Sequence, residues 1–152
     1  MSSQATPQDA ELILKLYDLR REPVMREARA FIAQFFPESL DDVLAVATAF
    51  GTKEQAYVRQ VYGYWEMAAS LVNRGAINRD LALDNYNEMF FAFAKIEPYL
   101  EGFRQTMGTP NFGRQTQQLV ESSAENKQRL ADMKKMQADM AQRRAGAAVG
   151  AR

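Results

Sequence analysis

The sequence predicts an all-α protein: an irregular antiparallel helical bundle, then an amphipathic C-terminal helix and a short disordered tail. Glycine, proline and short polar residues recur at spacings typical of helix ends. Apolar residues repeat every three or four positions, and no segment shows the sustained alternation of a half-buried strand. Of the 152 residues, 47% are hydrophobic and 11% aromatic, which is enough to form the core of a single domain.

Capping residues and prolines mark where the first four helices begin. Ser and Thr accept hydrogen bonds from the unpaired N–H groups of a first helical turn, and proline is tolerated at the first helical position. The expected starts are Thr6–Pro7 for a helix through Arg21, Pro23 for one that ends before Pro37, Ser39 for one that ends at Gly51, and Thr52 for the fourth.

The stretch YWEMAASLVNRGAINRD, residues 64–80, predicts a helical hairpin at the centre of the fold. Trp65 projects into a wide apolar sector of the fourth helix, whereas Glu66 falls in the polar sector and is expected in solvent. Gly75 fits the position just after a helix, and Asn78 fits the cap of the next helix. Because the connection is short, the two helices are expected to be antiparallel neighbours.

The fifth helix is expected to begin at Arg79 and to bury one apolar face. That face comprises Ala82, Tyr86, Met89, Phe90, Phe93 and Ile96. Phe91 projects from the polar side, so it is either covered by another element, such as the C-terminal helix, or exposed as a contact residue. Pro98 is expected to kink the helix or to begin a separate turn. Thr109–Pro110 predicts a short helix through Val120.

The chain divides into a helical core at residues 1–120, an amphipathic helix at 121–145 and a disordered tail at 146–152. Phe112 is the last aromatic residue. The net charge of zero is unevenly distributed, because residues 1–126 hold 12 basic and 17 acidic residues whereas residues 127–152 hold 7 and 2. The basic C-terminal segment is therefore expected to meet an acidic partner or the acidic body of its own chain.

The residue inventory excludes several classes of chemistry. The chain has no histidine and no cysteine, so zinc sites, Ser-His-Asp triads and Glu-x-x-His di-iron sites are ruled out. Asp80, Asp84 and Glu88 are spaced four residues apart, and we interpret them as a solvated face rather than a cation site. No cofactor and no enzymatic activity are expected.

The predicted C-terminal helix carries the clearest candidate interface. Leu130, Met133, Met136 and Met140 form a narrow apolar stripe, and methionine-rich surfaces adapt readily to partners. Together with Phe91, this stripe predicts a protein–protein interaction or assembly module, with a second copy of the chain as the first candidate partner. The stripe could instead lie on the chain's own domain.

Two alternatives remain open. Lys134, Lys135, Arg143 and Arg144 could bind RNA or another anionic surface, although no aromatic residue is interleaved among them for base stacking. DNA reading by the central hairpin is disfavoured, because the helix after Gly75 is mainly acidic. The second alternative is a small ligand held in an aromatic pocket formed by Tyr62, Tyr64, Trp65 and Tyr86.

Nothing in the sequence indicates export or membrane insertion. The N-terminal segment MSSQATPQDAE is polar, and no apolar run approaches the roughly 18 residues of a membrane span. A cytoplasmic location is expected.

Two stretches carry a family resemblance: DAELILKLYDLRREPVMREARAF and YGYWEMAASLVNRGAINRDLALDNYNEMFFAFAKIEPYLEGFR. Across residues 9–120 the chain resembles a group of small, functionally uncharacterised bacterial proteins, in which an aromatic-rich helix leads through a glycine turn into a second helix and an aromatic-proline segment. The resemblance implies a helical cytosolic bacterial protein. It implies no activity and transfers no functional residues.

Overall fold

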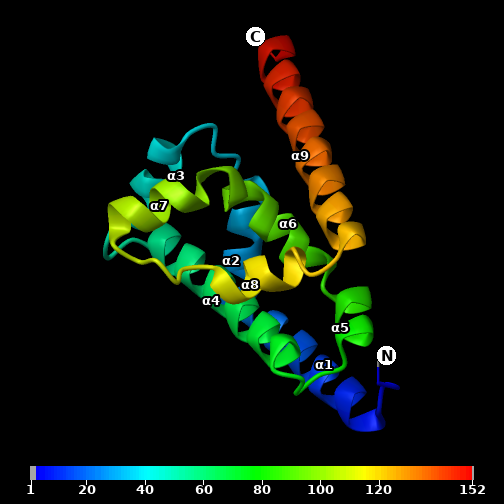
Figure 1. Cartoon of the computed structure of the whole chain (residues 1–152). Helices are drawn as coiled ribbons and strands as arrows, with labels where there is room; N and C mark the ends of the chain where they lie inside the picture. The colour runs from blue at the N-terminus through cyan, green and yellow to red at the C-terminus, as the bar shows by residue number, and fades with distance from the viewer. Residues whose placement is uncertain (1–2, 152) are drawn as a thin grey trace.

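Figure 1 shows the computed structural model, which describes residues 3–151. Within these residues all regular structure is helical, so the predicted all-α bundle is confirmed. In chain order the helices are α1 (Pro7–Arg20), α2 (Pro23–Gln34), α3 (Leu40–Ala47), α4 (Lys53–Asn73), α5 (Arg79–Asn85), α6 (Asn87–Ile96), the 3₁₀ turn η1 (Glu97–Tyr99), α7 (Leu100–Met107), α8 (Arg114–Val120) and α9 (Ala124–Gly150).

Most helix starts lie where the capping residues predicted them. In each case a side-chain oxygen accepts a hydrogen bond from the third residue after it, which satisfies an N–H without a partner inside the helix. The caps are Thr6, Ser39, Thr52, Asn78 and Ser123. Gly75 lies just after α4, in the turn of the central hairpin, with a positive φ of 76°, which suits a residue without a side chain.

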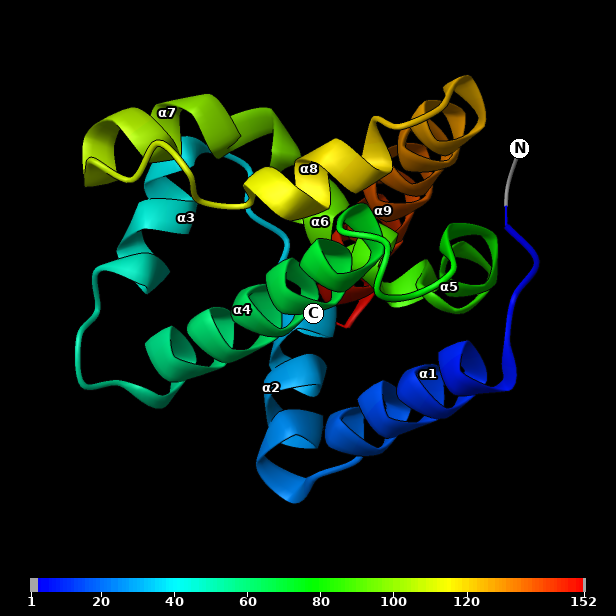
Figure 2. The ribbon, with the colours of Figure 1, turned by 60° about the horizontal axis from the view of Figure 1, so that its bottom comes forward.

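The long helix α4 is the centre of the bundle. In Figure 2, α1 and α2 lie on one side of α4 and α8 on the other, and α2 and α8 both pack directly against it. Trp65 of α4 is enclosed, as are Phe90 and Phe93 of α6 and Leu119 of α8. The last helix, α9, packs along α6, so its position depends on how α6 is held in the core.

The expected fifth helix is divided into α5 and α6 at Tyr86, so a single helix was the wrong prediction. Asn85 donates its side-chain amide to the Leu81 carbonyl oxygen at 2.8 Å, and Tyr86 takes φ −99° and ψ 30°, outside the helical range. The residues expected on its buried face are nevertheless all buried. The stabilisation gained by packing Tyr86 in the core therefore exceeds the cost of interrupting the helix.

The segment after α7 also differs from the expectation. Gly108 ends α7 with a positive φ of 63°, and the Thr109 N–H bonds the Arg104 carbonyl oxygen at 3.0 Å. Thr109 therefore belongs to the end of one helix rather than the start of the next. The next helix, α8, begins only at Arg114, after Gly113.

Helix α9 is longer than the expected segment 121–145. It continues through Gly150, so residues 146–150, predicted as disordered tail, are helical, whereas residue 152 lies outside the described residues. Four of the seven residues 145–151 are alanine, the residue with the highest helix propensity. The prediction of disorder rested on the position of these residues at the chain terminus.

Glu66 caps α8 instead of facing solvent, contrary to the expectation. One carboxylate oxygen accepts the N–H of Gln115 at 2.7 Å, and the other accepts the N–H and hydroxyl of Thr116 at 3.0 and 2.9 Å. The residue before α8 is Gly113, which has no side chain to cap with, so a glutamate from α4 takes that role. The position also suits a negative charge, because it lies at the positive end of a helix.

Replacing Glu66 should loosen the packing of α8 on α4. We expect Glu66→Ala to lower the free energy of unfolding by about 2 kcal/mol, since three hydrogen bonds to a charged group are lost. Urea denaturation followed by circular dichroism measures this. Glu11→Ala, which removes an exposed carboxylate of α1, should change stability by less than about 0.5 kcal/mol. Equal effects of the two substitutions would contradict the capping role.

Candidate functional site

A groove of about 700 Å³ is bounded by α2, α6 and α9. Its floor includes Val61 of α4, and α9 contributes Met133 and Met136. Three arginines, Arg20, Arg26 and Arg29, line the groove together with a single acidic residue, Glu88. The groove is therefore positively charged in one part and apolar in another. Its size is typical of sites that hold small molecules.

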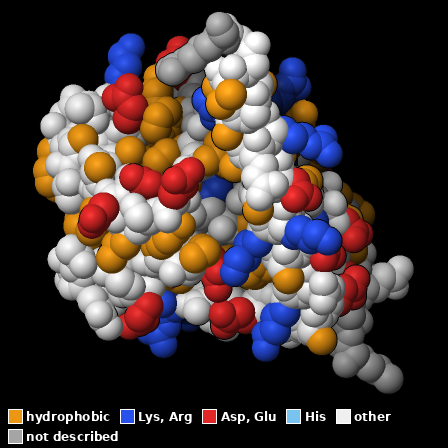
Figure 3. All heavy atoms as spheres, turned by 90° about the horizontal axis from the view of Figure 1, so that it is seen from above, with side chains coloured by type: hydrophobic (Ala, Val, Ile, Leu, Met, Phe, Trp, Pro, Cys, Tyr) orange, Lys and Arg blue, Asp and Glu red, His pale blue; other side chains and the backbone are white. Residues whose placement is uncertain are grey.

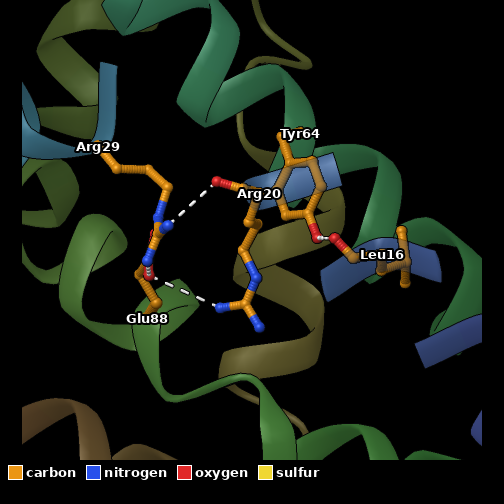
Figure 4. A network of polar contacts seen from close by, with 5 residues as sticks. All are labelled: Leu16, Arg20, Arg29, Tyr64 and Glu88. Carbon is orange, nitrogen blue, oxygen red and sulfur yellow. Dashed lines mark hydrogen bonds and ion pairs between the residues drawn. The ribbon is translucent and has the colours of Figure 1, made fainter. Parts of the chain in front are cut away.

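Glu88 joins three helices at the polar part of this groove. Its two carboxylate oxygens accept hydrogen bonds from Nε and Nη2 of Arg29, each at 2.7 Å, in the paired geometry that suits guanidinium and carboxylate groups. Arg20 approaches the same carboxylate from another side, with Nη1 at 3.6 Å. Arg29 also donates to the Arg20 carbonyl oxygen at 3.1 Å, so α1, α2 and α6 are tied together (Figure 4).

Several buried polar atoms beside this network have no hydrogen-bond partner. They are Nε of Arg20, Nε1 of Trp65 and the hydroxyl of Tyr86. The Arg20 guanidinium lies 5.2 Å from the Trp65 ring centre, and the Tyr86 ring lies 5.3 Å from it, so the three belong to one cluster. Each atom can donate a hydrogen bond, which leaves this part of the molecule rich in donors and poor in acceptors.

The predicted aromatic pocket is not present as a cavity. Trp65 and Tyr86 are packed edge to face, Tyr64 packs on Trp65 with ring centres 4.9 Å apart, and Trp65 is 1% exposed. Tyr62 lies elsewhere, near Phe112, beside a space of only about 20 Å³. The aromatic residues fill the core themselves because close packing of large rings stabilises it more than a void would.

Tyr62 and Tyr64 serve as neutral hydrogen-bond donors. Tyr62 donates to the Ala92 carbonyl oxygen at 2.8 Å, and Tyr64 donates to the Leu16 carbonyl oxygen at 2.5 Å. Burial raises the pKa of Tyr64 to about 12 and raises the pKa of Tyr62 and Tyr86 as well. These phenols therefore stay protonated at neutral pH.

The predicted apolar stripe of α9 is divided between the core and the surface. Leu130 and Met133 are each 8% exposed and pack on the chain's own domain, so they are not available to a partner. Met136 and Met140 remain 43% and 40% exposed. Phe91 is partly buried beside α9, and its carbonyl oxygen accepts a hydrogen bond from the Gln137 side chain at 2.6 Å.

The basic residues of α9 are divided in the same way. Lys134 pairs with Glu97 at 2.6 Å, and Arg144 donates to the Gln34 carbonyl oxygen at 2.8 Å. Both side chains hold α9 against the body. Lys135 and Arg143 are exposed.

Lys95 lies buried beneath α9, although the sequence offered no reason to expect it. Its ammonium group donates to the Phe35 carbonyl oxygen at 2.7 Å and lies 3.9 Å and 4.6 Å from the ring centres of Phe36 and Phe91. Burial, and next the charge of Arg144, lower the pKa of Lys95 to about 8. A cation at this position is held by a carbonyl and by aromatic faces.

The described residues contain no cluster of three or more His, Cys, Asp or Glu side chains suited to a metal ion. The expected alignment of Asp80, Asp84 and Glu88 is broken at Tyr86, and Glu88 binds arginines instead of facing solvent. Among residues 3–151, no helix combines the length and apolarity needed to cross a bilayer.

Sequence reasoning missed the arginines that line the groove. Arg29 and Ala30 lie three and four residues after Arg26, and Ala33 lies four and three residues after them, so all four share one face of α2. This pattern was visible in the sequence. What the sequence could not show is that Glu88, 59 residues after Arg29, lies opposite them.

Comparison with known proteins places the chain in a family. The family described as "domain of unknown function (DUF4760)" matches residues 5–123, most of the chain. The chain belongs to this family. The DUF4760 region covers α1 to α8 and ends at Ser123, the residue that caps α9, so α9 lies outside it. No curated protein and no solved structure matches the chain.

Removing the charge of Glu88 should destabilise the protein. We expect Glu88→Gln to lower the free energy of unfolding by about 2 kcal/mol, because two partly buried arginines lose their only acidic partner in the groove. Urea denaturation measures the change. Asp84→Asn removes the same charge from an exposed position of α5 and should have an effect below about 0.5 kcal/mol. A similar loss in both variants would rule out the network as a specific support.

Lys95 should make stability depend on pH in the alkaline range. Its pKa is about 8 when folded and near the ordinary 10.5 when unfolded, so between these values the unfolded chain binds more protons. The free energy of unfolding contributed by this group therefore rises as the pH increases from about 8 to 10.5. Below pH 8 the cost of burying the cation is fully present.

Lys95→Met provides the comparison, because it fills the same space without titrating. Urea denaturation of both proteins between pH 7 and pH 10 should show the native protein gaining stability relative to the variant above pH 8. A difference between the two proteins that stays constant with pH would contradict the assignment.

Proposed function

We propose that the protein is a non-enzymatic interaction module that self-associates through the exposed face of α9. The observation that carries the proposal is a self-complementary surface on that helix. Taking Met136 as 0°, Asp132, Met140 and Arg143 fall within about 40° of it on the helix. Leu130, Met133 and Gln137, the buried residues, lie on another side.

An antiparallel pair of α9 helices matches this surface to itself. If two copies cross near residue 138, Met136 of one copy meets Met140 of the other, and Asp132 meets Arg143. A two-fold interface requires such reciprocity, because each contact occurs twice. Exposed methionines supply adaptable apolar contact at the centre, and the opposite charges at the ends select the antiparallel direction.

Three further observations support an accessory role for α9. The helix lies outside the DUF4760 region. It is attached to the body partly by polar contacts, including Lys134 to Glu97 and Gln137 to the Phe91 carbonyl. Figure 1 shows its C-terminal part extending beyond the bundle.

A cytoplasmic location in a bacterial cell is part of this proposal.

Binding of RNA or another anionic surface is less well supported. Two of the four predicted basic residues, Lys134 and Arg144, are used inside the chain. On the face shown in Figure 3, basic and acidic side chains are interspersed rather than gathered by sign. A phosphate-binding surface usually presents a continuous basic area.

Self-association should depend on the charge pair at the ends of the α9 face. We expect the native chain to have twice its monomer mass of 17.2 kDa in solution, measured by light scattering after size exclusion. Arg143→Asp places two like charges opposite each other and should weaken the dimer at least about tenfold. Combining it with Asp132→Arg restores opposite charges and should restore the dimer.

Lys127→Asp is the matched control, because it makes the same change of charge on α9 but projects about 180° from Met136. It should leave the mass unchanged. A monomeric native chain, or equal effects of Arg143→Asp and Lys127→Asp, would overturn the proposal. A raised 260/280 nm absorbance ratio that disappears in Lys135→Ala/Arg143→Ala would favour RNA binding instead.

A further inference from the structure

The groove between α2, α6 and α9 changes from polar to apolar along its length. On α2, Arg26 and Arg29 come before Ala30 and Ala33, which share the same face. On α6, Asn87 and Glu88 come before Phe91 and Ala92.

The two helices are held with their polar ends together. Arg29 bonds Glu88 at one end, and at the other end Lys95 of α6 bonds the carbonyl oxygen of Phe35, just after α2. Along both helices the groove-lining residues change from polar to apolar in the same direction. Their polar residues therefore meet at one end of the groove and their apolar residues at the other. The groove is therefore amphiphilic along its axis.

The polar end has an excess of donors over acceptors. Glu88 is the only acidic residue lining the groove, and its carboxylate is already bonded to Arg29. Arg26 is exposed, and within residues 3–151 its side chain has no ion pair or hydrogen bond. Arg20 has a side chain only 12% exposed, and its Nε has no partner. An anionic group bound at this end would bring acceptor oxygens to a donor-rich region.

The apolar end offers room beside adaptable walls. Ala30 and Ala33 have short side chains, so α2 leaves space there, whereas Phe91, Met133 and Met136 form the facing walls. Methionine adjusts its shape to a ligand more readily than branched residues do. A volume of about 700 Å³ accommodates a small molecule and lies within the usual range for ligand sites.

We propose that this groove binds a small amphiphile with one carboxylate head and an apolar tail. Arg26 and Arg20 receive the carboxylate, and the tail lies between α2 and α6 under Met133 and Met136. The opposite charges of head and arginines place the ligand in one direction only. Met136 lines this groove and also belongs to the proposed dimer face, so the ligand site is tested at Arg26 and Ala33, which lie on α2 and outside that face.

Decanoate is the probe, and 1-decanol is the neutral comparator with the same tail. Calorimetric titration of the full chain should show saturable binding of one decanoate per chain, with the alcohol at least about tenfold weaker. The single tryptophan, Trp65, provides a second readout, because Arg20 lies 5.2 Å from its ring and a bound head group changes its surroundings.

Three variants separate the two ends of the site. Arg26→Gln removes an exposed charge at the polar end and should weaken decanoate about tenfold while leaving decanol nearly unchanged. Arg21→Gln is the matched control, since Arg21 is exposed close by but does not line the groove, and it should bind like the native chain. Ala33→Phe fills the apolar end and should weaken both compounds.

Four results would overturn the proposal. The first is the absence of saturable decanoate binding up to a concentration on the order of 1 mM. The second is decanol bound as tightly as decanoate, and the third is Arg26→Gln indistinguishable from Arg21→Gln. The fourth is an acidic amphipathic peptide that binds the groove when decanoate does not. Thermal unfolding of each variant confirms that it is folded.

Discussion

The Glu88 carboxylate between Arg29 and Arg20 is the contact on which the arrangement of this protein most depends. It joins the end of α1 and the middle of α2 to the start of α6, and it lies beside the packed rings of Trp65 and Tyr86. A carboxylate shared by two arginines in a partly enclosed place is stable only if all three stay in position, since a lone charge there would be poorly solvated. The Arg29–Glu88 pair therefore sets how α2 and α6 face each other, and this orientation determines the shape of the groove.

The position of helix α9 depends indirectly on this network, because α9 packs against α6, which carries Glu88. It packs along α6 through two buried apolar residues, Leu130 and Met133, and through polar contacts that include the Lys134–Glu97 pair. Lys95 lies beneath it, held by a carbonyl and by aromatic rings, and its burial there lowers its pKa. The helix thus closes one side of the groove while it keeps Met136 and Met140 at the surface. Met136 contributes both to the groove and to the proposed assembly surface, whereas Met140 belongs to the assembly surface alone.

Local sequence predicted helix starts well and helix interruptions poorly. Thr6, Ser39, Thr52 and Asn78 satisfy N–H groups three residues away, so their role depends only on nearby atoms. The break at Tyr86 depends on a ring packed against Trp65, 21 positions earlier in the chain. Glu66 was placed in solvent because its position on α4 is polar, yet α8 begins there and needs a negative cap.

The sequence by itself determined the helical class, most helix boundaries and the lack of any site built on histidine or cysteine, because these follow from residue types and short-range spacing. It also grouped Met136 and Met140 with Leu130 and Met133 in one apolar stripe of an amphipathic helix. Only the tertiary structure decided that the four aromatic residues form no pocket, that Leu130 and Met133 belong to the core, and that three arginines meet one glutamate in a groove. Those outcomes depend on which surfaces of distant helices meet, and a spacing rule describes only one helix at a time.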